Sequence, residues 1–221
     1  MTGQPTATRR AEPLGHRLPA YAGWMPAGKE PALPEGFRRA VLSLRTAAVR
    51  AEVVLHEVPA PGRLAPYAAA LTGDVPGPDG GTLSSGRLIA LHDPAGQEGW
   101  QSTTRLVAYV RAGTDPEMAA DPALPAVSWS WLVEALRSSG ARHVAAAGTV
   151  SRIASEPFGT LAGAQVTAAV ELRASWSPIG EDLGPHLAAW CDLLCSAAGL
   201  PPPAQGLLPL PVRRARAGGR R

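Results

Sequence analysis

The stretch Gln165-Val166-Thr167-Ala168-Ala169-Val170-Glu171-Leu172-Arg173-Ala174-Ser175-Trp176 alternates apolar and polar side chains. Its even-numbered positions are all apolar, and its odd-numbered positions are polar except for Ala169. Successive side chains of a β-strand point to opposite faces of a sheet. An alternation of this length therefore predicts a strand in an antiparallel sheet that is covered on one face only.

Other strands are expected around this one. Residues 143–155 are the predicted hairpin partner, joined to 165–176 through a turn that contains Pro157 and Gly159. Four earlier segments alternate or are rich in β-branched residues, namely 52–58, 67–74, 86–93 and 103–111. Residues 74–86 are rich in Gly and Pro, so we expect a loop there, and they lack the lysine of a phosphate-binding loop.

Three segments have the apolar spacing of helices. In residues 35–50 one stripe is apolar, formed by Phe37, Val41, Leu44 and Ala48. Residues 124–138 and 186–198 are apolar around most of the helix. The order α-β-β-(β)-β-α-β-β-α predicts an α+β fold, with a mainly antiparallel sheet of five or six strands and helices on one face. In this order it resembles the small dimeric fold of type III secretion chaperones.

Composition divides the chain into three parts. Residues 1–33 and 201–221 are rich in proline and lack periodicity, so both ends are expected to be disordered. Residues 34–200 are expected to form one domain.

The net charge of +3 comes from the end of the chain. Residues 1–212 hold 16 basic and 18 acidic side chains, so these counts do not predict a basic surface on the domain. The remaining basic charge belongs to a tail that could contact RNA, formed by Arg213, Arg214, Arg216, Arg220 and Arg221.

The chain contains no apolar run of membrane-spanning length and no signal peptide, so we expect a cytoplasmic protein without a membrane partner. Cys191 and Cys195 are four residues apart in an apolar helical segment and are expected to be buried thiols. Their spacing, with His186 nearby, does not match a zinc site. We therefore expect no metal and no cofactor.

Trp129 and Trp131 raise a geometric question about the helix that carries them. Residues two apart point about 160° apart around an α-helix, and the apolar arc of this helix spans roughly 260°. We expect Trp131 to lie in the core with Leu124, Val127 and Ala135. Trp129 would then face a second partner, which is either the last helix, another subunit or a ligand.

A few polar residues are candidates for binding. Asp115, Glu117 and Asp121 precede the tryptophan helix, where carboxylates cap backbone amides or form a small acidic site. His92 precedes a turn, and Arg105 lies on a strand. Three further arginines, Arg111, Arg152 and Arg173, also lie on strands, where they bind an anion, pair with Glu171 or are simply exposed to solvent.

Several motifs together resemble an actinobacterial family that is catalogued as a domain of unknown function. The similarity covers roughly residues 35–202 and rests on five stretches: Gly62 to Ala68, Gly86 to Gly96, Asp115 to Pro122, Trp129-Ser130-Trp131-Leu132, and His186 to Cys195. The resemblance implies no activity, substrate or catalytic residue.

Two classes of function fit these observations. The first is a non-enzymatic binding or adaptor protein, chaperone-like and homodimeric, with an apolar interaction face around Trp129. The alternative is an enzyme whose carboxylate, histidine and arginine groups converge only in three dimensions. A third and weaker hypothesis is an RNA-associated protein that binds through the arginine tail.

Overall fold

The computed structural model describes residues 33–62, 64–161, 163 and 165–202. Six antiparallel strands form one sheet with the order β1-β2-β3-β4-β6-β5. The arginine tail and the predicted disordered ends, except Leu33, Pro201 and Pro202, lie outside the described residues. The strands are β1 (Val54–Val58), β2 (Tyr67–Pro76), β3 (Thr82–His92), β4 (Thr104–Thr114), β5 (His143–Ser155) and β6 (Thr167–Pro178).

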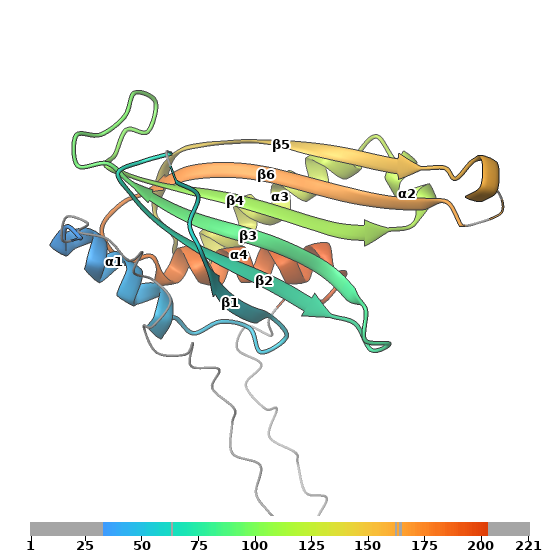
Figure 1. Cartoon of the computed structure of the whole chain (residues 1–221), viewed down its shortest axis with the longest axis horizontal. Helices are drawn as coiled ribbons and strands as arrows, with labels where there is room; N and C mark the ends of the chain where they lie inside the picture. Colours follow the sequence, from blue (N-terminus) through green and yellow to red (C-terminus); the bar gives the residue numbers. More distant parts are fainter. Residues whose placement is uncertain (1–32, 63, 162, 164, 203–221) are drawn as a thin grey trace, which may run out of the picture.

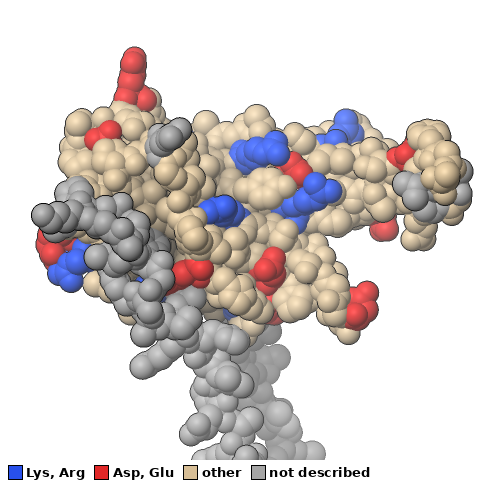
Figure 2. Space-filling model, viewed as in Figure 1, with Lys and Arg blue, Asp and Glu red and all other residues tan. Residues whose placement is uncertain are grey.

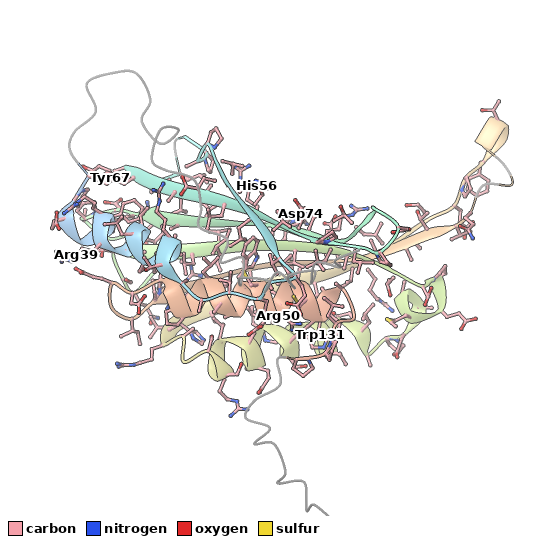
Figure 3. All side chains as sticks on the ribbon, turned by 90° about the horizontal axis from the view of Figure 1, so that it is seen from below. Arg39, Arg50, His56, Tyr67, Asp74 and Trp131 are labelled. Atoms are coloured by element: carbon pink, nitrogen blue, oxygen red, sulfur yellow. The ribbon has the colours of Figure 1, made fainter. Side chains whose placement is uncertain are left out.

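Among the described residues, the longer helices cover one face of this sheet and leave the other face open (Figures 1 and 3). They are α1 (Glu35–Thr46), α3 (Leu124–Ser138) and α4 (Gly184–Ala197), and α2 (Pro116–Ala120) is a single short turn before α3. A 3-10 turn, η1 (Gly159–Leu161), lies between β5 and β6. The α+β class, the element order and the one-sided covering are confirmed.

The predicted pairing of the last two strands is also confirmed, with Val150 opposite Leu172 in the β5–β6 hairpin. The predicted loop at 74–86 was too long, because β2 continues to Pro76 and β3 begins at Thr82. The composition of a loop came mainly from Gly77, Gly80 and Gly81, which lie in the short connection between β2 and β3. Gly73 and Gly86 pair across these two strands.

These two glycines create a slot for Trp190 of α4. A Cβ on Gly73 would lie 2.9 Å from the indole Cη2 atom, and one on Gly86 would lie 3.0 Å from Cζ2. Trp190 is completely buried. The helix is also tied to the sheet by the Ser84 hydroxyl, which donates to the Leu194 carbonyl over 2.7 Å. The middle of α4 thus lies directly on β2 and β3.

The rest of α4 is buried too. Cys191 and Cys195 are free thiols inside the core, as predicted. Burial raises the pKa of both, that of Cys195 to about 11, so neither is a reactive thiolate near neutral pH.

A polar pair lies inside the apolar core. The Trp176 indole N–H donates to Nδ1 of His186 over 3.0 Å. His186 is 2% exposed, and burial, with a smaller contribution from nearby His143, lowers its pKa to about 4. The histidine is therefore neutral at pH 7, with Nδ1 as acceptor and its proton on Nε2.

Candidate functional site

The two tryptophans of α3 flank its buried stripe. Ser128 and Leu132 are fully buried at the centre of that stripe, while Trp129 and Trp131 are each half-buried at its edges. Trp131 borders a cavity of only about 10 Å³ that is also lined by Leu193 and Ala197 of α4. The buried surface of α3 therefore spans the arc of about 160° that separates the two tryptophans around the helix.

Trp129 packs against the edge strand β5. A Cβ on Gly148 would lie 2.7 Å from its Cζ3 atom, so glycine is needed where the indole meets the strand. The partner of Trp129 thus includes β5 as well as the main core.

One expected core residue was wrong. Leu124 and Ala135 are buried, but Val127 is 44% exposed. The helical wheel could not locate the buried centre because the apolar arc is wider than any single packing face. Ser128, which interrupts that arc, is buried because its hydroxyl donates to the Leu124 carbonyl.

Of the three acidic residues predicted near α3, Asp121 makes a structural hydrogen bond and the other two are exposed without one. The Asp121 carboxylate accepts from the Ala123 amide over 2.8 Å. Asp115 is the residue before α2, although its side chain makes no capping hydrogen bond, and Glu117 lies exposed in the first turn of α2. Arg152 of β5 donates to the carbonyls of Ala119, Ala120 and Asp121. That arginine therefore fixes α2 to β5.

His92 lies on the helix-covered side of the sheet. Its ring stacks on Phe37 of α1 at 5.0 Å, and Nδ1 is 3.0 Å from the Thr104 hydroxyl. Burial lowers the pKa of His92. These contacts make it part of the seam between α1 and the sheet.

Arg105 lies on the opposite, open face. It is 9% exposed, and its guanidinium donates only to neutral oxygens: the Ala145 carbonyl at 2.8 Å and the hydroxyls of Ser175 and Ser177 at 2.8 and 3.2 Å. Ala145 has a positive φ of 52° at a register shift in β5. This bulge turns its carbonyl toward the arginine.

The sheet register gathers further polar groups on the open face. Arg111 and Arg173 both donate to the carboxylate of Glu171 over 2.8 Å, as the pairing alternative predicted. Tyr109 lies directly opposite Arg173 and two residues before Arg111 on β4, with the guanidinium carbon of Arg173 5.5 Å from the ring centre. Figure 2 shows basic side chains gathered around an acidic one over the middle strands.

Two members of this group, Arg87 and Tyr109, were not among the residues predicted from the sequence, whereas Arg173 was. Arg87 of β3 and Arg173 of β6 are the two cross-strand neighbours of Tyr109. The alternation of side chains within one strand shows which residues share a face of that strand, but not which residues of other strands lie beside them. Only the register between strands that are distant in sequence could show that they meet.

The predicted site residues do not form one site. His92 and Arg105 lie on opposite faces of the sheet, while Asp115 to Asp121 follow the far end of β4, ten residues or about 30 Å from Arg105. Within the described residues, no three His, Cys, Asp or Glu side chains are grouped to hold a metal. A groove of about 300 Å³ between α1 and α4 adds only Asp182 and hydroxyl groups.

Comparison with known proteins gives one family. Residues 33–207 match the family described as "Protein of unknown function (DUF3000)". The chain belongs to this family. The DUF3000 match includes every helix and strand of the fold, and it confirms the resemblance to a family of unknown function.

No curated protein and no solved structure matches this DUF3000 member. In the described part of the chain, none of the helices has the length and apolar character needed to cross a membrane.

Proposed function

We propose that the protein is a cytoplasmic, non-enzymatic binding or adaptor module that works as a homodimer through one sheet edge. This interaction edge consists of β5 together with Trp129 and Val133 of α3. The proposal is carried by the position of β5, which is the last strand of the sheet and pairs with a neighbour on one side only. The free, buried thiols of α4 suit a reducing compartment.

β5 is long and poorly protected for an edge strand. It spans 13 residues, contains no proline, and leaves residues 146–149 exposed. Its one arginine, Arg152, donates to a carbonyl at the end of α2 and therefore does not place its charge along the outer edge of the strand. Soluble proteins normally protect such edges with charge, proline or short strands, because unpaired amides and carbonyls invite another strand. The opposite edge, β1, has only five residues.

A second copy of the chain suits this edge. Two identical strands can pair antiparallel about a two-fold axis, so one edge supplies both halves of the contact. Val133, 50% exposed, lies one helical turn after Trp129 and adds apolar surface beside β5. Pairing would cover that surface and the strand edge together.

The enzymatic alternative has less support. A hydrolytic or acid–base site needs its groups within hydrogen-bonding reach of one substrate, whereas His92, Arg105 and the acidic residues near α2 lie in separate places. The described cavities likewise offer no enclosed space where these groups meet.

We expect Val133→Glu to weaken self-association at least tenfold, or about 1.4 kcal/mol. A carboxylate at this position would have to lose its water inside an apolar contact. Sedimentation velocity over a range of protein concentrations measures the effect. Circular dichroism should show unchanged helix content, because Val133 is exposed in the single copy.

Val127→Glu is the matched control. Val127 is 44% exposed on the same helix, but it lies one turn before Trp131 and away from β5. It should leave the dimer intact. A wild-type protein that stays monomeric at all concentrations, or an equal effect of both substitutions, would contradict the proposal.

A further inference from the structure

Charge is segregated between the two sides of the molecule. The described residues include 16 acidic side chains and 11 arginines, so this part of the chain is negative. The open face of the sheet reverses that balance. Its arginines are Arg87, Arg105, Arg111 and Arg173, against two acids, Asp74 and Glu171. Such a local reversal favours an anionic partner on this face.

Arg105 carries a positive charge that the protein does not neutralise. It forms no ion pair with any acidic residue in the described ranges, although it is nine-tenths buried. Burying a charge with only neutral partners is costly. Three hydrogen bonds hold the guanidinium in place, so it is preorganised for an incoming anion.

Tyr109 offers a flat ring in the middle of the same face. It pairs with Arg87 on one side and Arg173 on the other, and the latter lies over its ring. Arg87 donates to the Pro59 carbonyl, while its buried Nε atom has no hydrogen-bond partner. An aromatic ring between guanidinium groups is the arrangement on which unpaired bases stack beside bound phosphates.

The basic groups form a track along the sheet. From Arg105 to Arg111, six residues of β4 cover about 20 Å. Arg173 lies opposite the middle of this track. A flexible polyanion can follow such a row with successive charges. A double helix is less suited, because its bases already stack on one another and leave none for Tyr109.

We propose that the open face of the sheet binds single-stranded nucleic acid, with phosphates on Arg105, Arg87 and Arg173 and a base on Tyr109. The side chains of this site belong to β3, β4 and β6, and Arg105 also donates to the Ala145 carbonyl of β5. Val133, in contrast, lies on α3, on the helix-covered side of the sheet. Dimerisation and nucleic-acid binding can therefore fail independently, and the Val133→Glu monomer should retain the binding.

The test is fluorescence anisotropy of the full chain with a single-stranded RNA of roughly 12 nucleotides at several salt concentrations. Arg87→Gln/Arg173→Gln should bind at least tenfold more weakly, with a salt slope shallower by about 1.5. Arg38→Gln/Arg137→Gln removes the same charge from α1 and α3 and should change binding less than threefold.

Glu171→Gln provides the opposite test. It leaves Arg111 and Arg173 in place while removing the carboxylate that both contact. We expect binding to become severalfold tighter, a gain that misfolding cannot produce. An unchanged or weaker affinity in a folded Glu171→Gln protein would overturn the proposal.

Two further binding measurements, one with a truncated protein and one with a different polyanion, identify the binding region and the ligand. Removing residues 212–221 should leave the difference between wild type and Arg87→Gln/Arg173→Gln intact. If this truncation alone abolishes binding and the sheet variants have no effect, the tail is the binding site and the proposal is wrong. Equal affinity for a poly-glutamate peptide of matched charge, or no binding of RNA at all, would also overturn it.

Discussion

Gly86→Val is expected to destabilise the protein by about 3 kcal/mol, at the upper end of what overpacking costs. The new Cβ would collide with the backbone oxygen of Tyr109 and lie 3.0 Å from the Trp190 ring. Neither neighbour can move cheaply, because one belongs to the central strand β4 and the other is a fully buried indole. Urea unfolding followed by tryptophan fluorescence gives the change in the free energy of unfolding.

Gly113→Val is the control for the intrinsic effect of valine in a strand. A Cβ on Gly113 of β4 would meet nothing within 4 Å. Valine favours strands, so this variant should be at least as stable as the wild type. Adding Trp190→Leu to Gly86→Val should recover only the part of the loss that comes from the indole. If Gly86→Val and Gly113→Val have the same stability, the proposed fit of α4 on the sheet is wrong.

His186 should make stability depend on pH between about 6.5 and 4. Its folded-state pKa of about 4 is lower than its ordinary value of 6.5. Below pH 6.5 the imidazole of His186 becomes protonated in the unfolded chain but stays neutral in the folded protein. The free energy of unfolding therefore falls as the pH falls. The loss levels off below pH 4 at about 3 kcal/mol, and above 6.5 this residue contributes no pH dependence.

The main cause of the low pKa is the burial of His186, and nearby His143 contributes less. A proton on Nδ1 would face the indole N–H that donates to it, inside the buried core. His186→Asn keeps an acceptor oxygen near that position and removes the titration. Urea midpoints at pH 7 and pH 4.5 should differ much less for this variant than for the wild type. An equal difference in both proteins would show that other groups cause the pH dependence.

The fold was largely predictable because its signals are local. Alternation in 165–176 placed β6 and its two faces, and the hairpin with 143–155 followed from the turn between them. The error at 74–86 has a tertiary cause. Val75 and Ser84 pair across β2 and β3 and are buried on the helix-covered side, where the Ser84 hydroxyl donates to the Leu194 carbonyl of α4.

The candidate residues were less predictable. Local patterns placed Trp129 on an apolar helix and Arg105 on a strand, yet the wheel misplaced Val127 on the buried side. The overall charge of the domain gave no sign of a basic surface, because composition averages over faces that the sheet separates. Arg87 and Tyr109 were not predicted as site residues, because only the strand register shows that they are neighbours.

By itself, the sequence determined the α+β class, the order of the elements, the hairpin pairing and the burial of the two thiols. These depend on periodicity and on residues close together in the chain. Only the tertiary structure decided where α3 centres its buried stripe, which strand forms the long edge, and which arginines share the open face. Those features depend on strand register and helix packing, which join residues from distant parts of the chain.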